Sequence, residues 1–81
     1  MHYVIAYDVV SSRRRTKIMN ALKNRGLRVQ YSVFECELDR QRLEELKSEL
    51  RGLLNLRTDS LKVYPLCEKC FFQAESMGVE K

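Results

Sequence analysis

The sequence predicts a single α+β domain, and three observations support this prediction. Stretches rich in β-forming residues occupy 2–9, 27–38 and 60–66, two amphipathic helical patterns lie between them, and 81 residues are enough for only one domain. If the middle stretch folds back on itself, the order becomes strand, helix, strand, strand, helix, strand. This order is typical of a ferredoxin-like sandwich, an antiparallel sheet with both helices on one face. We therefore expect one domain over residues 1–81.

Residues 2–9 are predicted to form a central strand, because both faces of this stretch are largely apolar. Alternation puts Val4, Ala6 and Asp8 on one face, and Tyr3, Ile5, Tyr7 and Val9 on the other. Helices on one side of the sheet would leave Val4 and Ala6 in contact with water on the other side. A chain this short also buries only about 60% of its surface. We therefore expect a homodimer in which two sheets pack face to face.

Ser11 or Ser12 is expected to cap the first helix, since a hydroxyl there can accept hydrogen bonds from the free N–H groups of the first turn. The helix is predicted to run to about Arg25 and to stop at Gly26. Its apolar stripe is narrow, which indicates a helix lying on a surface; the stripe consists of Ile18, Ala21 and Leu22, with Met19 flanking it.

Residues 27–38 leave two interpretations open. The stretch is long for one strand, so it is either a hairpin that turns near Tyr31-Ser32 or a single bent strand. No Gly or Asn marks a turn within it.

Asp39 is expected to cap a second helix over about residues 40–54. Its leucines fall on one stripe at helical spacing: Leu43, Leu46, Leu50, Leu53 and Leu54. Such a stripe forms either a coiled-coil seam or a core face. The pattern lasts only about two heptads, whereas a coiled coil needs three or four, so we predict a core face.

The strand at 60–66 contains Pro65, which has no N–H to donate. This strand should therefore end at Pro65 or lie at an edge of the sheet. Residues 71–75 are predicted to add a short strand, within a C-terminal extension of about residues 67–81.

Charge is distributed unevenly along the chain. Residues 1–28 hold seven Lys or Arg residues and one acid, whereas residues 29–81 hold eight Lys or Arg residues and ten acids. A positive N-terminal part in a chain of net charge +4 indicates a polyanionic partner. No run reaches the ~18 apolar residues of a membrane span, and no signal peptide is evident, so we expect a cytoplasmic protein without a membrane partner.

Asp8 is a candidate metal ligand. It ends the first strand amid basic residues and is the only acid before Glu35. Ser11 and Ser12 stand closer to the helix start, so Asp8 is not needed as a cap. One carboxylate makes a poor site, but two chains related by a two-fold axis near Asp8 could hold one Mg²⁺ between them, with water and substrate phosphate completing the shell.

The start of the first helix is a candidate phosphate site. Arg13, Arg14 and Arg15 lie in its first turn, where cations are disfavoured by about 0.3–1 kcal/mol each. A bound anion would compensate this cost, because free N–H groups and arginine side chains both bind phosphate. The alternatives are that these side chains pair with acids elsewhere or lie in water.

The aromatic and sulfur-containing residues are less informative. Tyr7, Tyr31 and Phe34 could stack on bases, although such residues more often form core. Cys67 and Cys70 are spaced like half of a zinc ribbon without its other half, so an ordinary pair in a turn is the favoured interpretation.

Four segments resemble the CRISPR-associated protein two family, also called CRISPR-associated endoribonuclease two. They are Tyr7-Asp8-Val9, Arg13-Arg14-Arg15-x-Lys17-Ile18, Gly26-Leu27-Arg28-Val29-Gln30-Tyr31-Ser32-Val33-Phe34-Glu35-Cys36 and Val63-Tyr64-Pro65-Leu66-Cys67. The resemblance implies a ferredoxin-like homodimer that exchanges its C-terminal strands. It also implies metal-dependent cleavage of RNA or double-stranded DNA, and a bridging role between two dimers of the CRISPR integrase during spacer acquisition.

Carried over by position, the family's metal ligand is Asp8. The residues implicated in cleavage are Asp8, Tyr7, Arg15, Lys17, Arg28 and Phe34, and the residues expected to bind nucleic acid are Arg13, Arg14, Arg15, Lys17 and Arg28.

Three functions remain open on the sequence. The first is a sequence-nonspecific subunit that binds the DNA spacer precursor in the integration complex, and the second is a Mg²⁺-dependent phosphodiesterase that acts on RNA or DNA. The third is a toxin-like messenger-RNA endoribonuclease on the same fold.

Overall fold

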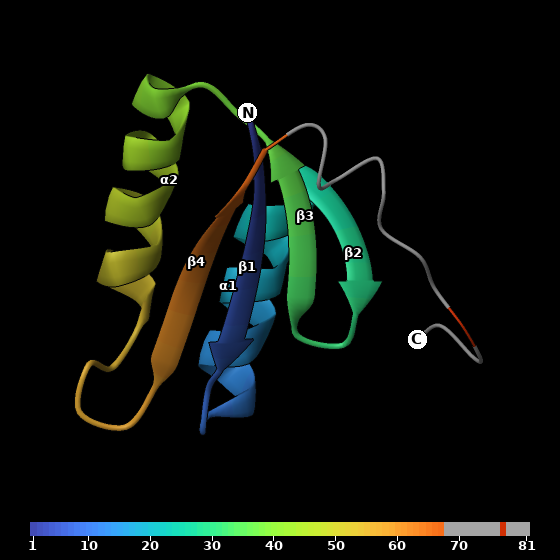
Figure 1. Cartoon of the computed structure of the whole chain (residues 1–81). Coiled ribbons are helices and arrows are strands. Elements are labelled where there is room, and N and C mark those ends of the chain that lie inside the picture. Colours follow the sequence, from blue (N-terminus) through green and yellow to red (C-terminus); the bar gives the residue numbers. More distant parts are fainter. Residues whose placement is uncertain (68–76, 78–81) are drawn as a thin grey trace.

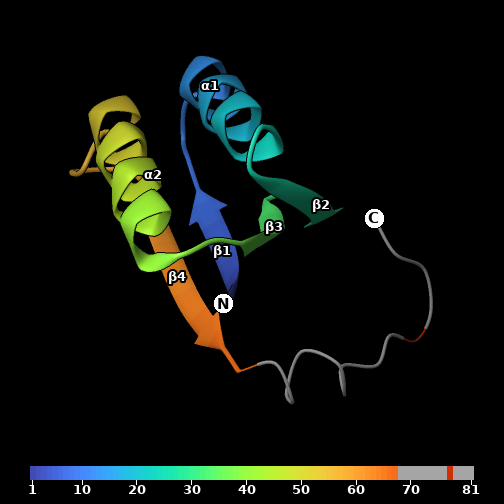
Figure 2. The same cartoon turned by 90° about the horizontal axis from the view of Figure 1, so that it is seen from above.

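The computed structural model describes residues 1–67 and 77, and it contains a four-stranded antiparallel sheet with two helices (Figure 1). The elements are β1 (His2–Asp8), α1 (Ser12–Lys23), β2 (Gly26–Gln30), β3 (Val33–Glu37), α2 (Arg40–Leu53) and β4 (Ser60–Leu66). The strand order is β2-β3-β1-β4, so β1 is central, as predicted. Both helices cover the same face of the sheet (Figure 2). The predicted α+β, ferredoxin-like architecture is confirmed.

Side-chain caps define the starts of both helices. The Ser11 hydroxyl accepts a hydrogen bond from the Arg14 N–H at 3.3 Å, and the Asp39 carboxylate accepts one from the Arg42 N–H at 2.8 Å. Both caps lie at predicted positions, because Ser and Asp satisfy N–H groups that the first turn leaves unpaired. The ends differ slightly from expectation: α1 ends at Lys23 rather than near Arg25.

The hairpin interpretation of residues 27–38 is correct. β2 ends at Gln30, β3 begins at Val33, and Tyr31-Ser32 forms the turn between them. The register shifts between Arg28 and Gln30, which indicates a bulge before the turn. Such an irregularity requires no Gly or Asn, so the sequence carries no conventional turn signal.

The hydrophobic core lies between the sheet and the helices. β1 directs Tyr3, Ile5 and Tyr7 toward the helices, and all three are buried. The helices contribute Ile18, Ala21, Leu22, Leu43, Leu46 and Leu50 to the same core cluster. The leucine stripe of α2 is therefore a core face, as predicted, and not a coiled-coil seam.

Among the residues that the structure describes, no helix lies on the opposite face of the sheet (Figure 2). Val4 and Ala6 lie on it and are only half-buried within one chain. In the register, Val4 is opposite Tyr64 of β4, and Pro65 lies in the same edge strand. An uncovered sheet face with half-buried apolar side chains is the feature from which we predicted a homodimer.

The expected strand at 71–75 lies outside the described part of the chain, as do most of the turn expected at residues 67–70 and most of the 67–81 extension. Neither helix among the described residues is long and apolar enough to cross a bilayer.

Gly26 opens β2 rather than simply ending α1. A Cβ atom at this position would lie 2.5 Å from the Cys36 sulfur and closer still to the Glu35 carbonyl oxygen. Only glycine permits β2 to approach β3 this closely, so the predicted helix-stop residue instead fixes a strand contact.

Gly26→Ala should lower the free energy of unfolding by about 1–3 kcal/mol, because the added methyl group overpacks this contact. The midpoint of urea unfolding measures the change. Gly52→Ala is the matched control, since a Cβ there meets no atom within 4 Å. This control should raise stability by about 0.4–1 kcal/mol. Equal effects of the two substitutions would contradict the close-approach role of Gly26.

Candidate functional site

Three elements meet at an open cavity of about 360 Å³: the C-terminal end of β1, the first turns of α1, and the β2–β3 turn. Four sequence-predicted residues line it together, namely Tyr7, Asp8, Arg15 and Arg28. Val9, Tyr31 and Ser32 complete the lining. The cavity therefore combines a carboxylate, a phenol and two guanidinium groups that lie up to 21 positions apart in the sequence.

Tyr7 forms the buried wall of the cavity. Its ring stacks on the buried Phe34 ring, with centroids 6.4 Å apart and planes at 25°. Its hydroxyl donates to the Tyr31 carbonyl oxygen at 3.4 Å. Burial raises the pKa of Tyr7 above its ordinary value, against the opposing effect of Arg28 and Arg15. The phenol is therefore protonated at neutral pH and acts as a hydrogen-bond donor, not as a base.

Arg28 is fixed by the turn that it precedes. Its Nε donates to the carbonyl oxygens of Gln30 at 3.3 Å and Tyr31 at 3.1 Å. The guanidinium carbon also lies 5.7 Å from the centroid of the Tyr31 ring, a cation–π distance. These contacts orient the guanidinium without neutralising its charge.

Arg15 is held in a similar way. Its Nε and Nη2 donate to the Val9 carbonyl oxygen at 3.3 and 3.2 Å, and Nη2 also reaches the Val10 carbonyl oxygen at 3.4 Å. Within the described part of the chain, neither Arg15 nor Arg28 forms an ion pair. Two oriented positive charges without carboxylate partners are suited to binding phosphate.

Arg14 has a different partner. Its Nε and Nη2 donate to the two carboxylate oxygens of Asp59 at 2.8 and 3.1 Å. The Asp59 side chain has no exposed surface, and it also accepts the backbone N–H groups of Val10 and Asn55. The hydrogen bond from Arg14 is the main reason that the pKa of Asp59 lies well below its ordinary value. This guanidinium is thus engaged in holding two loops together.

The arginine cluster predicted at the start of α1 is consequently divided. Successive residues on a helix point about 100° apart, so Arg15 reaches the cavity, Arg14 reaches Asp59, and Arg13 is exposed. Lys17 is also exposed and does not line the cavity. Phe34 supports the cavity only from behind, through Tyr7.

Sequence reasoning missed Asp59, because no local pattern connects it with a residue 45 positions away. It considered Tyr31 only as an aromatic residue and did not assign it to the site. The short Arg28–Tyr31 spacing could have shown that both residues belong to one turn.

Asp8 lies exposed at the end of β1, opposite Ser60 of β4. The described residues contain no group of three or more His, Cys, Asp or Glu side chains that could hold a metal ion. The described residues of one chain therefore offer a single carboxylate at this cavity. An exposed carboxylate without an ion-pair partner among the described residues fits Mg²⁺, which usually keeps several waters and takes only one or two protein carboxylates.

Comparison with known proteins identifies the family to which the chain is similar. Residues 1–74 match the family of CRISPR associated protein Cas2. The CRISPR-associated endonuclease Cas2 2 of Thermus thermophilus is 47% identical over 77 residues, covering 95% of this chain and 81% of that protein. The CRISPR-associated endoribonuclease Cas2 3 of Synechocystis sp. is 45% identical over 76 residues, covering 94% and 83%.

Two solved structures show the same fold. A hypothetical protein from Thermus thermophilus superposes with a TM-score of 0.89 at 45% identity, covering 99% of this chain and 93% of that one. Streptococcus pyogenes Cas2 gives a TM-score of 0.87 at 28% identity, covering 96% and 100%. Sequence matches over almost the whole chain, together with this structural similarity, show that the chain belongs to the CRISPR-associated Cas2 family.

Proposed function

We propose that this protein is the dimeric nucleic-acid-binding subunit of a CRISPR spacer-acquisition complex and that it hydrolyses phosphodiester bonds with Mg²⁺. The observation that carries the proposal is the cavity in which Asp8 and Tyr7 lie beside Arg15 and Arg28. Similarity to relatives named endonuclease and endoribonuclease supports hydrolysis of DNA or RNA.

Phosphate binding follows from the two cavity guanidinium groups. Both are oriented by backbone carbonyl oxygens, so little side-chain freedom is lost when a phosphate binds. Arg13 and Lys17 extend the positive surface along α1. None of these contacts depends on base identity, so binding should be indifferent to sequence.

The proposed metal site requires two chains. Mg²⁺ held by Asp8 of each chain at a two-fold axis would supply Lewis-acid activation of a phosphate and a water nucleophile of lowered pKa. Arg15 and Arg28 would hold the phosphate against this site. The Tyr7 phenol would donate a hydrogen bond from the buried wall, and Phe34 would keep its ring in place.

The proposed partners are a second copy of the chain through the open sheet face, the CRISPR integrase, and a double-stranded spacer precursor or RNA, all in the cytoplasm. Membership of the Cas2 family favours this assignment over a toxin-like messenger-RNA endoribonuclease. An integrase gene and a repeat array beside this gene would support the same choice.

Salt dependence tests the phosphate-binding part of the proposal. The affinity for a short duplex should fall steeply as salt rises, because phosphate contacts release counterions. Arg28→Gln should reduce the slope of log K against log salt by about 1 per substituted chain. Fluorescence anisotropy over a range of salt concentrations measures both.

Arg42→Gln is the matched control. Arg42 is exposed in the first turn of α2, at the end of the molecule opposite the β2–β3 turn (Figure 1). Its slope should equal that of the wild type. Binding that is independent of salt would falsify the proposal.

A further inference from the structure

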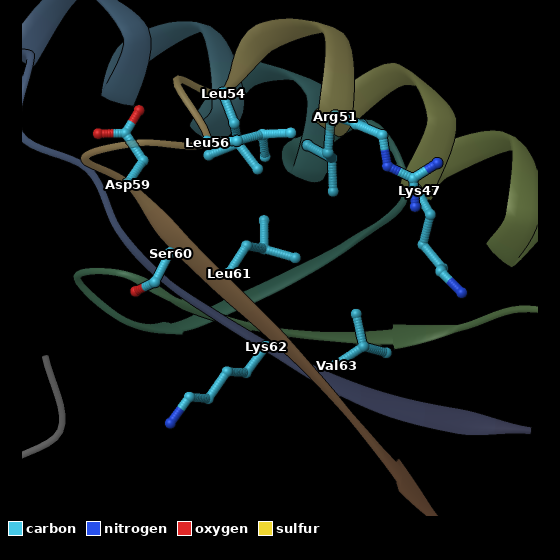
Figure 3. Close-up of a pocket in the computed structure, with 10 residues that line it drawn as sticks. Lys47, Arg51, Leu54, Leu56, Asp59, Ser60, Leu61, Lys62 and Val63 are labelled. Atoms are coloured by element: carbon cyan, nitrogen blue, oxygen red, sulfur yellow. The ribbon is translucent and has the colours of Figure 1, made fainter.

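A second cavity, of about 380 Å³, lies on the helix side of the molecule between α2 and β4. Figure 3 shows Leu61 and Val63 pointing from β4 toward α2, across from Leu54 and Leu56. Leu50 contributes to the same apolar lining. We call this cavity the α2–β4 groove. It shares no lining residue with the cavity of about 360 Å³ described above, which contains Asp8 and lies at the end of β1.

The charged side chains at the groove are mainly positive. Lys47 and Arg51 are one helical turn apart on α2 and reach over the same end of the groove (Figure 3). The Lys47 ammonium forms an ion pair with the Glu44 carboxylate at 3.3 Å. Arg51, in contrast, forms no ion pair with any described residue. Among the described residues, the only acid in the lining is Asp59, whose carboxylate has no exposed surface and is held by Arg14.

These features identify the chemistry of an occupant. Leucine and valine side chains offer a surface on which apolar groups can be buried. The positive charges of Lys47 and Arg51 at the edge of the groove attract carboxylates. Leu56 is 70% exposed at this site, so its apolar surface has no cover in the described structure. A nucleic-acid backbone would gain nothing from the apolar floor. The net charge of +4 gives a second folded copy no general attraction to this positive groove.

We propose that the α2–β4 groove docks a short acidic peptide segment of a partner protein, with apolar side chains on the leucine and valine floor and carboxylates at Arg51 and Lys47. Peptide segments that dock in grooves commonly combine apolar anchors with flanking charges in this way. The inference goes beyond the proposed function, because the groove uses none of the residues assigned to nucleic acid.

A fluorescently labelled peptide in which leucines alternate with glutamates is a suitable probe, with the full-length chain as receptor. The peptide should bind saturably, and Arg51→Glu should weaken binding at least about tenfold by placing like charges together. Leu56→Ser should weaken it through loss of apolar contact. Arg42→Glu is the matched control, since it makes the same change on α2 away from the groove, and it should leave the affinity unchanged.

Three outcomes would overturn the inference. They are absence of binding to the wild type, equal losses in Arg51→Glu and Arg42→Glu, and binding that appears only after residues 68–81 are removed. The last result would assign the groove to the chain's own C-terminal segment, which also combines apolar residues with acids. Duplex binding, measured on the same variants, separates these outcomes from failure of the nucleic-acid proposal.

Discussion

Asp8→Asn should reduce Mg²⁺-dependent cleavage of RNA or duplex DNA by at least about 100-fold. Substitution of groups that only support metal ligands already costs about 10–100-fold, and Asp8 is the one carboxylate among the described residues that lines the cavity. Asparagine keeps the size of the side chain but loses the charge that a hard cation requires. Initial rates with the wild type and the variant, each in Mg²⁺ and in chelator, measure the effect.

A second measurement on the same variant does not depend on activity. In the proposed dimer, two Asp8 carboxylates would meet at a two-fold axis and would repel each other unless a cation lay between them. Mg²⁺ should therefore raise the Tm of the wild type but not that of Asp8→Asn. Without metal, Asp8→Asn should dissociate less readily into single chains than the wild type.

Glu45→Gln is the matched control, because Glu45 is an exposed acid on α2 away from the cavity. It should cleave like the wild type. Equal cleavage by Asp8→Asn and the wild type, with and without chelator, would indicate a contaminating nuclease. Loss of cleavage without any effect of Mg²⁺ on Tm would remove the shared-metal arrangement.

The sequence predicted those parts of the fold that depend on local chemistry. Ser11 and Asp39 cap helices because their side-chain oxygens reach N–H groups three residues ahead. Residues 60–66 form an edge strand that contains Pro65, because proline cannot donate to a second neighbour. Each of these features is encoded within a few residues, so it can be recognised without knowledge of the tertiary structure.

The remaining features arise from contacts between distant residues. The role of Gly26 depends on how closely β3 approaches, and the division of the arginine cluster depends on where Asp59 lies. Asp8 and Arg15 are only seven positions apart, so the sequence alone predicts that they lie near each other. Arg28, in contrast, could be assigned to the site only through resemblance to a family. The fold explains its position, because the β2–β3 hairpin returns the chain to the end of β1.

Asp59 is expected to be the residue whose loss destabilises the fold most strongly through polar contacts. Its buried carboxylate accepts hydrogen bonds from Arg14, from the Val10 N–H and from the Asn55 N–H. Asp59→Ala would remove the main acceptor of the Arg14 guanidinium and the side-chain acceptor of two backbone N–H groups. Because the Arg14 side chain is 31% exposed, water can partly replace its lost acceptor, and we expect the Tm to fall by about 5–10 °C. Differential scanning calorimetry measures the shift.

The same contacts make the stability depend on pH in a defined direction. The pKa of Asp59 is lower in the folded state than the ordinary value of about 3.9. Its contribution to stability is therefore complete above about pH 4 and declines as the pH falls below this value toward the folded-state pKa. Asp59→Asn lacks this contribution, so its deficit relative to the wild type should be constant above about pH 4 and should shrink in more acidic solution.

Urea midpoints of the wild type and Asp59→Asn between about pH 3 and 7 test this expectation. Asp39→Asn is the matched control, because Asp39 is an exposed cap and asparagine caps a helix about as well as aspartate. Its curve should run close to that of the wild type. A deficit in Asp59→Asn that stays the same down to pH 3 would show that the negative charge of Asp59, as distinct from its shape, does not hold the two loops together.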